Sequence, residues 1–169
     1  MIRPAAPADA PAIRAVHEAA FPTPAEADLV EALVADGDGV VALVDARNGT
    51  VAGHVLLSRM RVGGGDRAYR ALGLAPVAVL PGHQGARIGS RLIEAALAVA
   101  EAMGEELVFV LGEPDYYRRF GFAAETAAPF ASPYAGPYFM ALKLNEDLPL
   151  PRSGAAAYAP AFAHFGAGT

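Results

Sequence analysis

The chain of 169 residues contains no cysteine. This excludes a disulfide framework, a cysteine-ligated zinc or iron–sulfur cluster, and a thiol nucleophile. The four histidines show neither H-x-x-x-H nor H-E-x-x-H spacing, so we expect no metal site built on histidine. At this length a single domain can bury a hydrophobic core without disulfides or a structural metal.

Charged residues are also scarce. They make up 18% of the chain, and the net charge is −5 at a pI near 5.3. Because nucleic-acid-binding proteins usually carry a basic surface, we expect no nucleic-acid partner. No apolar run approaches the roughly 18 residues that cross a bilayer, and the N-terminus lacks the basic and apolar regions of a signal peptide. We therefore predict a cytoplasmic protein with no membrane partner.

The apolar periodicity predicts an α/β fold with a single mixed sheet flanked by helices. A strand, a long helix and a strand in succession indicate a parallel crossover. The dipeptide Asn48-Gly49 predicts a hairpin, and Pro76 predicts a break in the hydrogen-bond ladder of its strand. We expect one domain over residues 1–146 and an irregular tail, residues 147–169, packed on it. The predicted helices cover about residues 9–20, 24–35, 88–103 and 114–120, and the predicted strands cover 40–44, 51–60, 72–79, 107–111 and 138–144.

The segment from Val79 to Ser90 joins a buried strand to the long helix. The first amides of a helix have no internal partner and lie at the positive end of its dipole, so they attract anions. Gly85 and Gly89 allow an anion close to the backbone, and Ser90 adds a hydroxyl. The segment is neither a Walker A loop nor a G-x-G-x-x-G motif, which argues against a nucleotide-binding module. On spacing alone, a tight turn without a ligand remains an alternative.

This segment resembles motif A of the GNAT superfamily, the acyl-CoA-dependent N-acetyltransferases. The match consists of Gln84, Gly89 and the strand 77–79, while Arg87 stands where the family usually has glycine. The run from Tyr116 to Phe122 resembles motif B, and Ile2-Arg3-Pro4 with the first helix resembles the opening of the fold. Further likeness, including the tail segment 158–162, points to the YhbS-like branch.

The resemblance implies acetyl-CoA as acyl donor, a GNAT fold with a splayed sheet, and no metal. It implies that Tyr117 is catalytic and protonates the departing CoA thiolate. Arg87 could crowd the phosphate, pair with it or face solvent. The residues implied to bind the pantetheine arm are Val77, Ala78 and Val79, and those implied to bind the pyrophosphate, mainly through backbone N–H groups, are Gln84, Gly85, Ala86, Arg87, Ile88, Gly89 and Ser90.

No general base stands out from the sequence. Glu26, Glu113 and His54 are candidates, but for each a structural or solvent-facing role is the better explanation. Four aromatic residues beside Pro-rich turns could line an acceptor cleft or fill the core: Phe21, Phe130, Tyr134 and Tyr138.

The most consistent interpretation is an acetyltransferase that moves an acetyl group from acetyl-CoA to an amine. A small-molecule amine is a better candidate than a protein, and a homodimer is left open. The alternative is a non-catalytic acyl-CoA-binding domain with a regulatory or sensing role. Because the chain has no cysteine, transfer through an acyl-cysteine is excluded, and direct attack in a ternary complex is the simplest mechanism.

Overall fold

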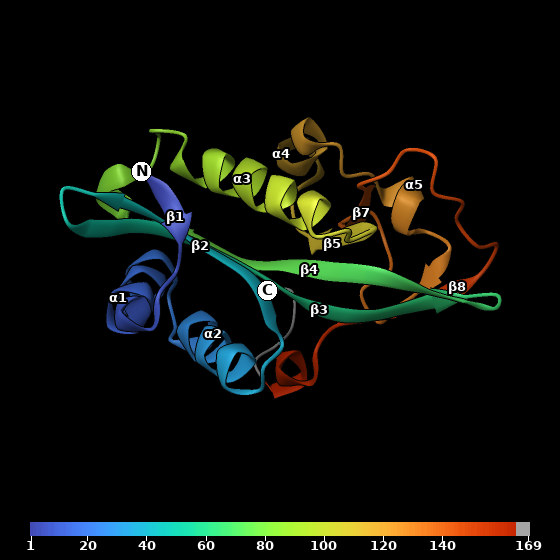
Figure 1. The fold of residues 1–169 in the computed structure, drawn as a ribbon, viewed down its shortest axis with the longest axis horizontal. Helices are drawn as coiled ribbons and strands as arrows, with labels where there is room; N and C mark the ends of the chain where they lie inside the picture. Colours follow the sequence, from blue (N-terminus) through green and yellow to red (C-terminus); the bar gives the residue numbers. More distant parts are fainter. Residues whose placement is uncertain (165–169) are drawn as a thin grey trace.

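A computed structural model describes residues 1–164, and it contains one mixed sheet with helices on both faces (Figure 1). The main path of the sheet runs β1-β2-β3-β4-β5-β7, and β8 pairs with β3 and β6. Helix α3 covers one face, while α1 and α2 lie on the other. The predicted mixed α/β sheet is confirmed. The strands are β1 Ile2–Pro4, β2 Gly39–Arg47, β3 Thr50–Gly64, β4 Arg67–Val79, β5 Leu107–Leu111, β6 Phe130–Ala131, β7 Phe139–Lys143 and β8 Gly154–Ala157.

The helices follow the predicted apolar spacing. In α3 (Ile88–Ala102), Ile88, Leu92 and Ala96 recur every four residues and are buried against the sheet. On the opposite face α1 (Ala10–Ala20) packs beside α2 (Ala25–Ala35). The shorter helical elements are α4 Pro114–Tyr117, α5 Ala124–Ala127 and the 3-10 helices η1 Pro7–Asp9, η2 Pro81–His83, η3 Arg118–Phe120 and η4 Pro160–His164.

The strand β4 is irregular at the predicted proline. In its pairing with β3, Val77 lies opposite Val55 and Leu74 lies opposite Leu57. Two residues of β4, Ala75 and Pro76, therefore stand opposite a single residue of β3 and form a β-bulge. The parallel pairing of β4 with β5 is confirmed, but it extends only over residues 71–73 of β4. Beyond residue 73 the two strands separate, and the stretch where they are no longer paired is called the gap below. The ladder break predicted from Pro76 lies next to this gap.

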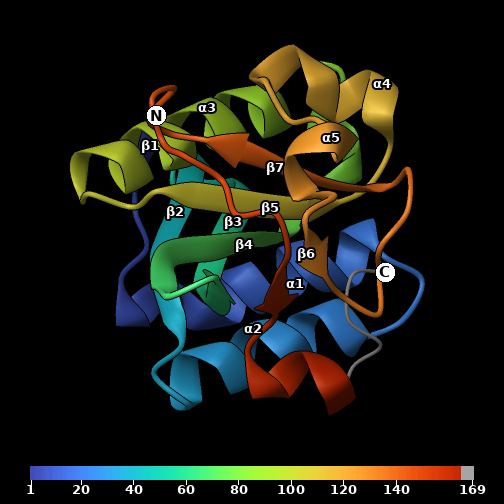
Figure 2. The same ribbon diagram turned by 90° about the vertical axis from the view of Figure 1, so that its right-hand side faces the viewer.

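The tail corrects one expectation. Residues 154–157, predicted to be irregular, form β8, which pairs with β3 over residues 61–64. It occupies the edge of β3 that β2 has left, since β2 pairs with β3 only as far as Ser58. The last turn, η4, lies beside α2 (Figure 2). Glycine and alanine have weak strand propensity, so this strand depends on the available edge rather than on its own sequence.

A carboxylate with no exposed side-chain surface holds the start of β5 to the neighbouring strands. The Glu105 oxygens accept hydrogen bonds from Arg59 at 2.6 and 3.0 Å and from Arg70 at 2.7 Å. Burial opposes ionisation of Glu105, but the two guanidinium groups outweigh it and lower the pKa of the carboxyl group. This ion-pair network fixes the register of β3, β4 and β5 at the end opposite the gap.

Two histidines form a buried pair between α1 and β3. His17 Nε2 lies 2.8 Å from His54 Nδ1, and both side chains are almost fully buried. Burial lowers the pKa of His17 to about 4. It lowers the pKa of His54 to about 3, with a further contribution from repulsion by His17. Both rings are therefore neutral at pH 7 and share one proton in their hydrogen bond.

The histidine pair predicts a loss of stability in mild acid. The unfolded chain takes up protons near pH 6.5, whereas the folded pair resists them until about pH 4. The free energy of unfolding therefore falls as the pH decreases through this range. His54→Gln is expected to show a shallower fall, measured by urea denaturation at a series of pH values. Parallel pH dependence in the two proteins would refute this assignment.

Candidate active site

The first element of the site is an unpaired edge of β4. Residues 77–79 pair on one side with Val55, His54 and Gly53 of β3. On the other side β5 has already separated, so in the described residues this edge has no strand partner. An extended ligand can pair with the free N–H and C=O groups as an added strand does.

Helix α3 approaches this edge closely because of a glycine. A Cβ atom on Gly53 would lie 2.9 Å from side-chain carbons of both Ile88 and Leu92. The glycine therefore permits the start of α3 to pack against β3 beside the end of β4. The helix N-terminus and the free edge of β4 become neighbours.

The turn between β4 and α3 is exposed, as an anion-binding turn must be. Residues 84–87 are exposed, and Gly85 has a φ of +89°. The first helical hydrogen bond here runs from the Arg91 N–H to the Arg87 carbonyl, 3.0 Å, so the preceding amides have no partner within the helix. The Gln84 side chain donates to the Val79 carbonyl at 3.3 Å and ties the turn to β4. An exposed turn with unpaired helix-end amides is the geometry that the anion cradle predicted from the sequence requires.

The departure from the family motif at Arg87 has a backbone consequence. Arg87 precedes α3 with φ 61° and ψ 21°, in the left-handed region. A side chain there costs about 1–2 kcal/mol, which glycine avoids. The Arg87 side chain is exposed and has no ion-pair partner among residues 1–164. It is therefore available to a bound anion.

Ser90 does not present its hydroxyl to the turn. The side chain is buried, and its oxygen lies 3.1 Å from the Tyr116 hydroxyl. This corrects the expectation that the hydroxyl adds to the anion site, and only the Ser90 amide remains available. The Tyr116 hydroxyl thus bonds to a side chain of α3. The contact joins α3 to α4.

Tyr117 lies at the end of α4, next to the strand end of β5. Its ring packs against the backbone of Gly112, where any Cβ atom would overlap it, and edge-on against Phe122. Burial raises the pKa of Tyr117 to about 12, with a smaller effect from Tyr116. In residues 1–164 its hydroxyl has no hydrogen-bond partner. The group is a neutral donor, free to bind a ligand.

The three candidate bases occupy different environments. Glu113 is exposed, and His54 is committed to His17. Glu26 Oε1 is buried and has no hydrogen-bond partner within the described part of the chain. Glu26 is therefore not the solvent-facing carboxylate that its position on α2 suggested.

The four aromatic residues proposed to line an acceptor cleft also occupy different environments. Phe130 is buried in the core, edge-on to Phe109 and Tyr69, so it does not line a cleft. Phe21 stacks on His17, and Tyr138 is 53% exposed. Tyr134 packs edge-on against Tyr158 of the tail, a residue whose position the sequence did not indicate.

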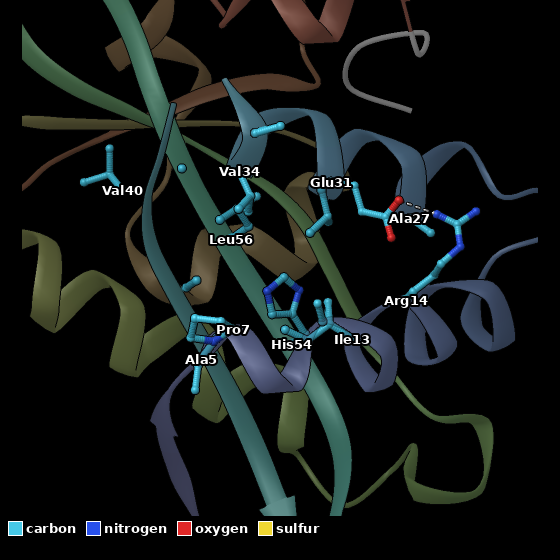
Figure 3. Close-up of a pocket in the computed structure, with 16 residues that line it drawn as sticks. Ala5, Pro7, Ile13, Arg14, Ala27, Glu31, Val34, Val40, His54 and Leu56 are labelled. Carbon is cyan, nitrogen blue, oxygen red and sulfur yellow. Dashed lines mark hydrogen bonds and ion pairs between the residues drawn. The ribbon is translucent and has the colours of Figure 1, made fainter. Parts of the chain in front are cut away.

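A cavity of about 480 Å³ lies elsewhere, between α1, α2 and β2 (Figure 3). Its lining is mostly small apolar side chains, and the ion pair between Arg14 and Glu31 spans 2.9 Å beside it. It lies on the face opposite α3, so it is separate from the cradle. Within residues 1–164 there is no cluster of three metal-binding side chains, and no helix is long and apolar enough to cross a membrane.

Comparison with known proteins agrees with this geometry. The family model described as "Acetyltransferase (GNAT) domain" matches residues 1–124. Over 116 residues the chain is 39% identical to YjhQ of Escherichia coli K12, an uncharacterised N-acetyltransferase, covering 68% of this chain and 64% of YjhQ. Over 123 residues it is 37% identical to YhbS of the same strain, also an uncharacterised N-acetyltransferase, covering 72% of each. The chain thus spans less than two thirds of YjhQ.

Two solved structures share the whole fold. YhbS from Escherichia coli in complex with CoA has a TM-score of 0.89 at 31% identity, covering 100% of this chain and 95% of that one. A GNAT family acetyltransferase from Brucella melitensis in complex with acetyl-CoA has a TM-score of 0.78 at 36% identity, covering 96% and 97%. Because the family model covers more than half of the chain and these relatives share its fold, the chain belongs to the GNAT acetyltransferase family.

Proposed function

We propose that this protein transfers an acetyl group from acetyl-CoA to the amine of a small molecule. The observation that carries the proposal is the free edge of β4, which runs directly into the exposed turn before α3. Two structural relatives hold CoA and acetyl-CoA, which supports the same ligand here. The cytoplasmic location stays a prediction.

The two features match two parts of CoA. The amide-containing pantetheine arm would lie along Val77, Ala78 and Val79 as a short added strand and pair with the backbone groups there that β3 and Gln84 leave free. The pyrophosphate would accept hydrogen bonds from the amides of residues 85–90 at the positive end of α3. The arm would then extend along the gap, with its thioester between the diverging strands.

The chemistry needs only groups that the chain provides. The amine nitrogen attacks the thioester carbonyl carbon, the C–S bond breaks, the amine loses its proton to solvent, and the electron pair leaves with the CoA sulfur. A strand N–H polarises the carbonyl, and Tyr117 donates a hydrogen bond to the departing sulfur. Because the pKa of Tyr117 is well above that of a thiol, the phenol acts first as a donor to the developing thiolate. Direct attack also fits a chain without cysteine.

Tyr117→Phe removes that donor while keeping the ring against Gly112. We expect kcat for CoA release with a reactive amine to fall by about 10²–10⁴-fold, with little change in the Kd for CoA. The control is Tyr69→Phe, since the Tyr69 hydroxyl donates to the Pro149 carbonyl and the residue lies before the paired residues 71–73 of β4. Unchanged turnover in Tyr117→Phe would refute its role. CoA binding without acetylation of any amine in a broad panel would favour the alternative, a non-catalytic acyl-CoA-binding domain.

Arg87→Gly tests both the backbone and the side chain. Relief of the left-handed strain should stabilise the protein by about 0.5–1 kcal/mol, after allowance for the freer unfolded chain. Loss of the guanidinium should weaken CoA binding several-fold at low salt and much less at high salt. The control is Arg91→Ala, which removes an exposed charge one turn further along α3. If the CoA affinity of Arg87→Gly is unchanged at every salt concentration, the Arg87 side chain does not contact CoA and faces solvent.

A further inference from the structure

The C-terminal segment brings a tyrosine to the point where β4 and β5 separate. Gly73 is the last β4 residue paired with β5. A Cβ atom on Gly73 would lie 2.7 Å from a ring carbon of Tyr158, so only glycine allows the ring to rest on the strand there. Tyr158 follows β8 directly, and the pairing of β8 with β3 fixes its position.

The hydroxyl groups of the six tyrosines divide into three kinds. Tyr69 donates to the Pro149 carbonyl at 3.0 Å, and the Tyr116 hydroxyl contacts Ser90, so both have a structural role. Tyr138 is half exposed. Among residues 1–164, the hydroxyls of the remaining three, Tyr117, Tyr134 and Tyr158, have no hydrogen-bond partner.

Two of these phenols, Tyr134 and Tyr158, lie together beside the last paired residue of β4, Gly73. The rings of Tyr134 and Tyr158 have centroids 5.7 Å apart. Burial raises the pKa of Tyr158, and the neighbouring Tyr134 and Tyr117 raise it further. Tyr117 and Tyr158 are therefore neutral at pH 7, and a phenol can both donate and accept a hydrogen bond.

Tyr117 and Tyr158 reach the gap from opposite faces of the sheet. Tyr117 packs against the hydrophobic cluster that α3 covers. Tyr158 packs against the clusters on the other face, where α1, α2 and the tail lie. With Tyr117 on one face of the sheet as the donor to the departing sulfur, Tyr158 is placed to contact an amine that approaches the thioester from the other face.

We propose that Tyr158 binds the attacking amine: its hydroxyl oxygen accepts a hydrogen bond from the amine N–H and orients the nitrogen lone pair toward the thioester. The rings of Tyr158 and Tyr134 contact the body of the acceptor, which is therefore an apolar amine, such as an arylalkylamine, rather than a strongly polar one. The proposal rests on the proposed function, because it assigns the acceptor side of the same site. It makes the tail strand β8 part of the active site.

The test compares Tyr158→Phe with the unmodified protein, using acetyl-CoA with phenethylamine and with ethanolamine. The unmodified protein should prefer phenethylamine by about tenfold or more in kcat/KM. In Tyr158→Phe the kcat/KM for phenethylamine should fall by about tenfold, through a higher KM for the amine, while the KM for acetyl-CoA stays constant. The melting temperature should change little, because the ring is retained.

The controls separate this proposal from the one that it rests on. Tyr69→Phe loses only a structural hydrogen bond to the Pro149 carbonyl, so it should keep the amine KM of the unmodified protein. Tyr158→Ala should lower both the melting temperature and the affinity for the amine. A Tyr158→Phe protein with unchanged amine KM, or with a raised KM for acetyl-CoA instead, would overturn the role of Tyr158. A preference for ethanolamine would overturn the apolar acceptor. Failure of the proposed function would instead appear in the unmodified protein, either as no binding of CoA by calorimetry or as CoA binding without acetylation of any amine.

Discussion

The central constraint in this protein is the short pairing between β4 and β5. The two parallel strands exchange hydrogen bonds only over residues 71–73 of β4, and the bulge at Ala75 and Pro76 lies just beyond. Every backbone group left unpaired in a buried place costs about 1–3 kcal/mol unless water or a ligand satisfies it. The gap is thus a stretch of sheet that a strand-like ligand completes, and the remaining features are arranged around it.

Different contacts stabilise the two ends of the β4–β5 pair, the end where the strands are paired and the end where they have separated. Glu105 with its two arginines fixes β3, β4 and β5 where they are still paired. Gly53 allows α3 to approach the opposite end, so that the free amides of the helix lie next to the free edge. Two phenols, Tyr117 and Tyr158, lie at the gap from opposite faces. In the proposed function, CoA binding, amine positioning and hydrogen-bond donation to the sulfur all depend on this one break in the β4–β5 ladder.

Much of this arrangement could be predicted from local sequence. The stripe on α3, the break at Pro76 and the crossover to β5 follow from periodicity and from the chemistry of proline. The left-handed conformation of Arg87 could not be predicted in this way. Arginine itself gives no sign of a positive φ, and only the glycine that the family usually has at this position indicates one. The contacts of Ser90 with Tyr116 and of His17 with His54 join residues 26 and 37 positions apart. The strand β8 has almost no signal of its own, and its partner edge exists only in the folded sheet.

The central claim is that CoA completes the open edge of β4 and the turn before α3. Amide hydrogen–deuterium exchange, with and without CoA, measures this directly, because exchange slows where a backbone N–H becomes hydrogen-bonded. The account predicts that CoA slows exchange in the peptides covering residues 77–79 and 85–90 and leaves the β2 peptides unchanged. Unaltered exchange at these two segments under saturating CoA, or protection confined to α1 and α2 around the separate cavity, would contradict it.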